Sequence, residues 1–257
     1  MLRNRLIAVL LVKDGALYNT KNFKTDKYVG DPINAVKIFN EKKCDELMIC
    51  GYQVSLNSTD IDFGLIREVA EEANMPICYV GGVSNVNQAK KLISVGAEKI
   101  GISSNGHRNS DVVSEIINEI GAQSVVAVID YKFQKKIFGK KIKVVTHHNN
   151  LILDMEPLEL AQTYENLGVG EIVFNNVDRD GGKTGYDVDF LKNARKILNI
   201  PITALGGCGS LSDVAILTNE VGLIGGAAST IFLYKGRHDA VLIQYPDEKQ
   251  KNIATEL

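Results

Sequence analysis

The sequence lacks an apolar run of the roughly 18 residues that a membrane-spanning helix needs. Its N-terminal apolar stretch, residues 6–12, follows Arg3 and Arg5 and resembles the beginning of a signal peptide. That stretch ends at Lys13-Asp14, however, and no small-residue cleavage site comes after it. We therefore expect a cytoplasmic protein that does not associate with a membrane.

The sequence also lacks the signatures of nucleic-acid binding, of zinc binding and of a disulfide framework. A net charge of −2 over 257 residues offers no excess of positive charge to a polyanion, so we expect no nucleic-acid partner. No two of the four cysteines form a C-x-x-C pair, and most lie in apolar, strand-like stretches, as small buried side chains do in a reducing compartment. We expect neither a metal site nor a cofactor.

What the sequence does contain is a repeat of half its length. Segment 30–51 parallels segment 155–176, and "MPICYVGGVSN" (75–85) parallels "IPITALGGCGS" (200–210). Aligned residues in both segments, such as Glu46 and Glu171, differ by a constant 125 positions. A constant offset over separate segments indicates a duplicated half-domain. We expect one domain, 1–257, built from halves of about 1–124 and 125–257.

The sequence pattern in each half predicts strands that alternate with helices. Helix starts are marked by Asp31-Pro32, by Ser110 or Asp111, and by Asp187. Short β-branched runs predict the strands Leu6–Val12, Leu47–Cys50, Ile77–Val80, Ile100–Ile102, Val125–Ile129, Ile172–Phe174, Ile202–Ala204 and Leu223–Gly225. Two equal sets of four strands predict a (β/α)8 TIM barrel with right-handed crossovers. The symmetric duplication argues against the alternative, a doubly wound open sheet.

Paired glycines and hydroxyl side chains follow opposite strands of the predicted barrel: Gly81-Gly82, Ser103-Ser104, Gly206-Gly207 and Ser229-Thr230. Glycine backbone N–H groups, hydroxyls and helix N-termini together bind phosphate. Because active sites of such barrels lie at the C-terminal ends of the strands, we predict two phosphate sites, for a ligand phosphorylated at both ends. The alternative is a pair of tight turns, above all in the first copy, where Tyr79 and Val80 crowd the approach.

The segment "NNVDRDGGKTGYD" (175–187) leaves the sixth predicted strand with a high density of acidic residues. It places Asp178 and Asp180 near the barrel mouth, and it adds Gly181 to the predicted phosphate-binding set. The alternative is a solvated polar turn. The lysine-rich segment 131–155 predicts a hairpin over the mouth, which we interpret as solvated rather than as a ligand or partner site.

The motifs "VKDG", "GDP", "DEL", "VGG", "GAEK", "DRDG", "GYD" and "AAS" run along nearly the whole chain. Together they resemble the cyclase subunit of imidazole glycerol-phosphate synthase. The resemblance implies a (β/α)8 barrel that forms a heterodimer with a glutaminase subunit. Ammonia from the glutaminase would travel through the barrel to a bisphosphorylated ribonucleotide, where two aspartates act as general acid and base.

The resemblance also implies an ammonia gate of four charged residues at the bottom of the barrel. The matching positions are Arg5, Glu46, Lys99 and Glu171, each immediately before a predicted strand. All four should therefore lie near one level, where two positive and two negative charges can pair. The alternative is a structural plug of salt bridges, which the sequence cannot separate from a gate.

The catalytic set of the family is incomplete. Asp130 matches one catalytic aspartate, whereas the other falls at Leu11. The internal repeat gives the same pairing, because "LIAVLLVKDG" (6–15) and "VVAVIDYKFQ" (125–134) align with Leu11 opposite Asp130. Leucine cannot transfer a proton, and losing one partner of an acid–base pair typically costs on the order of 10² to 10⁴ in rate. Gly51, Asn19 and Ser103 also depart from the family pattern.

These departures resemble a paralogous branch of the family that is associated with amidine formation on sugars of bacterial surface glycans. We therefore expect a subunit that channels ammonia to a separate sugar amidotransferase and binds a phosphorylated small molecule. One alternative is a true cyclase of histidine biosynthesis, which makes imidazole glycerol phosphate with Asp130 and with Asp180, or Asp178, as the second acid. Another is a non-catalytic scaffold that only activates its glutaminase.

Overall fold

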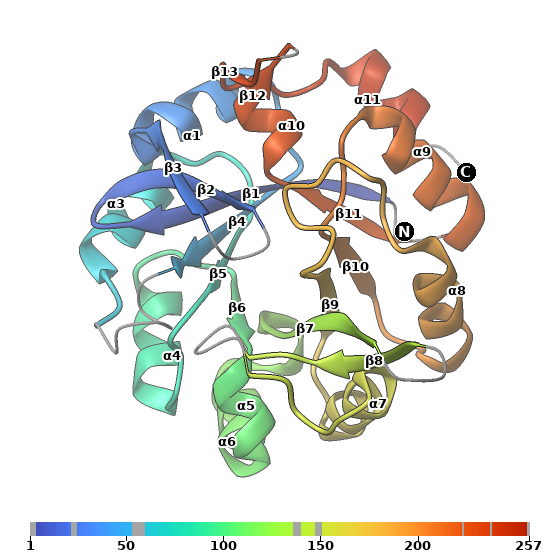
Figure 1. The fold of residues 1–257 in the computed structure, drawn as a ribbon. Helices are drawn as coiled ribbons and strands as arrows, with labels where there is room; N and C mark the ends of the chain where they lie inside the picture. The colour runs from blue at the N-terminus through green and yellow to red at the C-terminus, as the bar shows by residue number, and fades with distance from the viewer. Residues whose placement is uncertain are drawn as a thin grey trace.

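The computed structural model describes residues 4–21, 25–52, 60–135, 140–146, 151–222, 224–236 and 238–255. In these ranges eight parallel strands close into a barrel with helices around its outside (Figure 1). The barrel strands are β1 (Arg5–Lys13), β4 (Glu46–Gly51), β5 (Ile77–Val80), β6 (Lys99–Ile102), β7 (Val125–Lys135), β9 (Glu171–Asn176), β10 (Ile202–Leu205) and β11 (Gly225–Ala228). β1 closes the barrel by pairing with β11 on one side and β4 on the other. The predicted (β/α)8 TIM barrel is confirmed.

The helices, in chain order, are α1 (Pro32–Glu41), α3 (Phe63–Glu72), α4 (Val86–Ser94), α5 (Ser104–Arg108), α6 (Ser110–Ile120), α7 (Pro157–Leu167), α8 (Val188–Ile197), α9 (Leu211–Val221), α10 (Thr230–Leu233) and α11 (Glu248–Thr255). Asp31 caps α1, and its carboxylate accepts a hydrogen bond from the Asn34 N–H at 2.8 Å. α6 begins at Ser110, but its capping side chain is that of Asn109. Within the described ranges, none of these helices is long and apolar enough to cross a membrane.

An antiparallel hairpin leaves the first strand of each half. β2 (Ala16–Lys21) and β3 (Thr25–Gly30) follow β1, and β8 (Lys140–Val144) folds back on β7. The turn between β1 and β2 is Asp14-Gly15, with φ of 49° and 72°, a conformation that favours Asp-Gly. The hairpin after β7 is the one that the sequence predicts. The hairpin after β1 is missing from the prediction, and β11 begins at Gly225, where the prediction ends a strand. A short pair, β12 (Tyr234–Lys235) and β13 (Ala240–Val241), follows α10.

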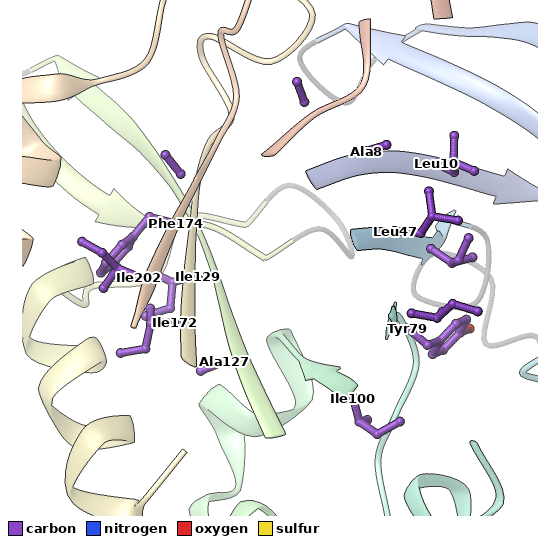
Figure 2. Close-up of a cluster of buried hydrophobic side chains, with 14 of the residues drawn as sticks. Ala8, Leu10, Leu47, Tyr79, Ile100, Ala127, Ile129, Ile172, Phe174 and Ile202 are labelled. Carbon is purple, nitrogen blue, oxygen red and sulfur yellow. The ribbon is translucent and has the colours of Figure 1, made fainter. Parts of the chain in front are cut away.

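Alternation along the barrel strands divides the apolar side chains into two cores. Outward-facing residues such as Leu10, Tyr79 and Phe174 pack against the helices (Figure 2). Inward-facing residues form a second cluster, the inner core: Ile7, Val9, Met48, Cys78, Val80, Val126, Val128, Val173 and Ala227. The inner core fills the middle of the barrel, between the residues that begin the strands and those that end them.

Candidate functional site

Four barrel strands begin with charged residues that meet at the N-terminal end of the barrel. Arg5, Glu46, Lys99 and Glu171 begin β1, β4, β6 and β9, so they lie at one level. The Arg5 guanidinium contacts Glu46 Oε2 at 2.5 Å and Glu171 Oε1 at 2.7 Å. Lys99 Nζ contacts Glu46 Oε1 at 2.9 Å and Glu171 Oε2 at 3.0 Å. Each charge therefore touches both opposite charges, and we call these four residues the charge ring.

Pairing offsets the burial of the carboxylates in the charge ring. The side chains of Glu46 and Glu171 are 5% and 8% exposed, against 23% for Arg5 and 21% for Lys99. Burial by itself would raise the pKa of Glu171, but Arg5 and Lys99 outweigh burial and lower that pKa. Burial by itself would lower the pKa of Lys99, but Glu171 and Glu46 raise it instead. Glu171 and Lys99 therefore stay charged at neutral pH.

Thr203 on β10 adds a fifth side chain to this end of the barrel. Its hydroxyl donates a hydrogen bond to Glu171 Oε1 at 2.6 Å. Gly225 on β11 makes room for it, because a Cβ at Gly225 would lie 2.1 Å from the Thr203 hydroxyl oxygen. Sequence reasoning missed Thr203, although strand alternation places it on the same inward face as Leu205.

A pocket with about 890 Å³ of empty space opens at the opposite, C-terminal end of the barrel. Its lower wall consists of inner-core residues, among them Val9, Met48 and Val128. The predicted site residues that line it are Gly81, Ser103, Asp130, Asp180, Gly181, Gly206, Gly207, Ser229 and Thr230. Gly82, Ser104 and Asp178 lie outside its lining.

Asp130 lies on β7, two residues after the inner-core residue Val128, and is only 6% exposed. Asn175, opposite it on β9, donates a side-chain N–H to Asp130 Oδ1 at 2.7 Å. Burial raises the pKa of Asp130 to about 7; the hydrogen bond from Asn175 works against this rise and the charge of Asp180 adds to it. A carboxyl group with this pKa exchanges protons near neutral pH, as a general acid or base must.

Leu11 occupies the corresponding place on β1. It lies opposite Cys50 of β4 and packs, with Cys50 and Leu205, against the inner core. Burial raises the pKa of the Cys50 thiol to about 12, and Asp130 and Asp180 add to the rise, so the thiol stays protonated at neutral pH. The pocket therefore has an apolar side around Leu11 and a polar side around Asp130.

The hairpin after β1 contributes Thr20 to the pocket wall and contacts the loops after β9 and β11. Thr20 Oγ1 donates to Asp180 Oδ2 at 3.2 Å, and Ser229 Oγ donates to Asn19 Oδ1 at 3.3 Å. Asp178 has another role, because its Oδ2 accepts the backbone N–H of Phe133 at 2.7 Å. Asp180 is therefore the second carboxylate of the pocket, and Asp178 supports the hairpin after β7.

The second predicted phosphate site is more complete than the first. Gly206 and Gly207 have φ of +89° and +103°, and a Cβ on Gly207 would lie 2.1 Å from the Gly185 carbonyl oxygen. Only glycine allows this close approach of the Gly207 and Gly185 backbones, and Gly206, Gly207 and Ser229 all line the pocket. At the first site Gly81 lines the pocket, but the Ser104 hydroxyl is buried without a hydrogen-bond partner in the described part of the chain.

Asn175 and Thr20 are pocket residues that sequence reasoning missed. Alternation from Glu171 through Val173 would have placed Asn175 on the inward face of its strand. The Asp14-Gly15 pair would have predicted the hairpin that carries Thr20. Within the described ranges, no group of three or more His, Cys, Asp or Glu side chains is arranged to hold a metal ion.

The comparisons with known proteins agree with one another. The family model described as "Histidine biosynthesis protein" matches residues 5–239. A Vibrio vulnificus (strain YJ016) protein, provisionally named imidazole glycerol phosphate synthase subunit hisF3, is 39% identical over 100% of this chain and 98% of its own length. A Leptospira interrogans protein, provisionally named as the HisF subunit, is 41% identical over 98% of both chains. The imidazole glycerol phosphate synthase subunit HisF of Lactococcus lactis subsp. cremoris (strain MG1363) is 31% identical over 98% of this chain and 95% of its own.

Proposed function

The chain belongs to the histidine biosynthesis protein family, among the HisF-like subunits of imidazole glycerol phosphate synthase, and we propose that it conducts ammonia from one end of its barrel to the other. A glutaminase subunit would bind at the charge ring, form a heterodimer with this chain and release ammonia from glutamine. The ammonia would then serve amidine formation on a bacterial surface-glycan sugar, through a separate sugar amidotransferase.

The observation that carries the proposal is the succession of charge ring, inner core and pocket along one axis. Arg5, Ile7, Val9 and Leu11 follow one another on the inward face of β1 and belong in turn to all three. Neutral ammonia can pass apolar side chains that a hydrated ion cannot, because an ion loses its hydration there. The charge ring would close this route until a partner separates its ion pairs.

The pocket supports a chemistry other than the two-aspartate ring closure. Leu11 and Cys50, which pair across β1 and β4, offer no group that exchanges a proton near neutral pH, whereas Asp130 does. A single acid–base group suffices to take a proton from, or return it to, an ammonia nitrogen. Gly206, Gly207 and Ser229 would bind a phosphate group of a ligand in the same pocket.

The test is steady-state turnover of the bisphosphorylated ribonucleotide by this chain alone, with ammonium salt in place of the glutaminase. Leu11→Asp and Asp130→Asn are measured alongside. We expect no turnover by the unmodified chain, and stimulated glutamine hydrolysis when it is mixed with a synthase glutaminase subunit. Cyclase-like turnover that Asp130→Asn abolishes would refute the amidination proposal and restore histidine biosynthesis.

The cyclase alternative has one observation in its favour, because Asp180 lines the pocket together with Asp130. It predicts that Asp180→Asn and Asp130→Asn each abolish turnover of the ribonucleotide. The scaffold alternative predicts stimulated glutaminase activity with all of the ammonia released to solvent. If an acceptor gains the ammonia nitrogen while free ammonia is scavenged from the solution, the scaffold alternative is excluded.

A further inference from the structure

One hydrogen bond at the start of β1 is made to a side chain rather than to the backbone of the neighbouring strand. At the start of β9, by comparison, the Ile172 N–H donates to the backbone carbonyl of Pro201 at 3.0 Å. At the start of β1, the Leu6 N–H donates to Asp45 Oδ2 at 3.1 Å. The junction between β1 and β4 at the bottom of the barrel therefore depends on the position of one carboxylate.

The C-terminal part of the chain holds that carboxylate in place. Lys251 Nζ, on α11, contacts Asp45 Oδ1 at 2.6 Å, and the two side chains are only 13% and 6% exposed. The Tyr245 hydroxyl accepts the Asp45 N–H at 3.2 Å and donates to the Leu6 carbonyl at 2.7 Å. Because a carboxylate buried to this extent needs its partner cation, the position of Lys251 fixes the position of Asp45.

The same helix also contacts the residue before Arg5. Asn4 Nδ2 donates to the Thr255 carbonyl, at the end of α11, at 2.7 Å. The helix itself lies on the outside of the barrel, beside α9 (Figure 1). Arg5 therefore stands between two residues, Asn4 and Leu6, that the segment 245–255 holds from outside the barrel.

Arg5 and Glu46 are the members of the charge ring that these contacts place. Arg5 precedes Leu6 and Glu46 follows Asp45 in the chain, and their side chains meet at 2.5 Å. The ion pair of Lys99 with Glu171 joins two other strands, β6 and β9. A shift of α11 should therefore weaken the pair of Arg5 with Glu46 more than the pair of Lys99 with Glu171.

We propose that α11 is the positioning element of the charge ring, and that Lys251 holds Arg5 beside Glu46 through Asp45. The consequence rests on the proposed function: a partner that displaces α11 would weaken this ion pair, and so open the charge ring, without contacting either residue of the pair. The positioning role of Lys251 does not itself require ammonia to pass through the barrel.

A double-mutant cycle measures the coupling of Arg5 with Glu46 by urea-induced unfolding of the chain alone. The cycle compares Arg5→Met, Glu46→Gln and the double variant with the unmodified chain. We expect the coupling energy to fall to less than about half when the cycle is repeated in Lys251→Met. Lys251→Arg keeps a cation at this position and should retain most of the coupling.

Two controls separate positioning from a general loss of stability. The cycle of Lys99→Met with Glu171→Gln should keep at least about three quarters of its coupling energy in Lys251→Met. Lys192→Met makes the same change in an exposed pair with Glu220 and should leave the coupling of the first cycle unaltered. A Lys251→Met variant that loses stability but keeps both coupling energies would overturn the proposal, and so would an equal fall in both cycles.

Hydrogen exchange tests the same contact where a multiple variant does not fold. In native Lys251→Met, the exchange rate of the Leu6 N–H should rise by about tenfold relative to that of the Ile172 N–H. The Ile172 N–H lies at the same level of the barrel but donates to backbone, so it serves as the internal reference. An unchanged ratio of the two rates would overturn the proposal. Both measurements use the chain alone, so they stay readable if ammonia proves not to pass the charge ring.

Discussion

Replacing Lys99 by methionine measures how much the charge ring contributes to stability. The change removes one of two cations and leaves Glu46 and Glu171, with side chains 5% and 8% exposed, to share Arg5. Removing one partner of a buried ion pair typically costs about 3–5 kcal/mol. Arg5 still contacts both carboxylates, and Lys99 is itself 21% exposed, so we expect a smaller loss of about 2–3 kcal/mol.

The stability lost in Lys99→Met should depend on pH, because the charge ring sets the pKa values of its carboxylates. In the unmodified chain Arg5 and Lys99 outweigh burial and lower the pKa of Glu171, so its stabilising contribution is present above the unfolded pKa of about 4.3 and is lost as the pH falls through the folded pKa. With Lys99 gone, Arg5 stabilises one of the two carboxylates less than the other, and burial raises the pKa of the less stabilised one. That carboxylate takes up a proton as the pH falls, so the deficit of the variant is largest near pH 8 and smaller near pH 5.

The assay is urea-induced unfolding at both pH values, with Lys90→Met as the matched control. Lys90 and Glu119 form a pair at 2.9 Å, but their side chains are 55% and 47% exposed, so this control should lose no more than about 0.5 kcal/mol. Adding Glu46→Gln to Lys99→Met restores charge balance and should recover most of the lost stability. A Lys99→Met variant no less stable than Lys90→Met, or a deficit independent of pH, would refute the reasoning.

Three further predictions concern other parts of the barrel. Gly207→Ala should lower the melting temperature more than Gly222→Ala, because both glycines have positive φ, of +103° and +91°, but only the new Cβ at Gly207 meets a backbone oxygen, at 2.1 Å. Burial raises the folded pKa of Asp130 to about 7, so the stability that Asp130 contributes to the unmodified chain should be lost as the pH rises from about 4 to 7. Asp130→Asn has no such loss, and in denaturant titrations at pH 8 it should be more stable than the unmodified chain by about 1–3 kcal/mol. Tyr245→Phe should cost about 1–2 kcal/mol in urea unfolding, because the buried Tyr245 hydroxyl donates to the Leu6 carbonyl at 2.7 Å.

The barrel could be predicted from the sequence because its strands are short β-branched runs whose order repeats. Ile77–Val80 has the predicted bounds, and other strands extend a few residues past theirs. The four residues of the charge ring were named by the family resemblance, and their common level could be predicted because each stands at the start of a strand and strand starts of a parallel barrel share one level. The barrel and this common level depend on the course of the backbone alone.

The pocket was harder to predict because its contacts join segments that are far apart in the chain. Thr20 meets Asp180 across 160 residues, and the position of Thr20 depends on the hairpin after β1, which the internal repeat does not predict. Asp178 and Asp180 are both acidic and two residues apart, yet one binds the Phe133 N–H and the other lines the pocket. Sequence proximity to a strand end could not separate them, since the direction of each side chain depends on the local turn.

The two halves of the barrel have diverged at the pocket end and cooperate at the other. Corresponding pairs lie near the pocket on the first two barrel strands of each half: Leu11 with Cys50 in the first, and Asp130 with Asn175 in the second. The first pair is apolar, and the second carries the carboxyl group whose pKa burial raises to about 7. The charge ring needs both halves, because Glu171 from the second half completes the pairs of Arg5 and Lys99 from the first. The carboxyl group with a pKa near neutrality therefore comes from the second half, whereas the ion pairs at the bottom of the barrel join the two halves. A substitution at Leu11 should consequently change the chemistry of the pocket without opening the charge ring.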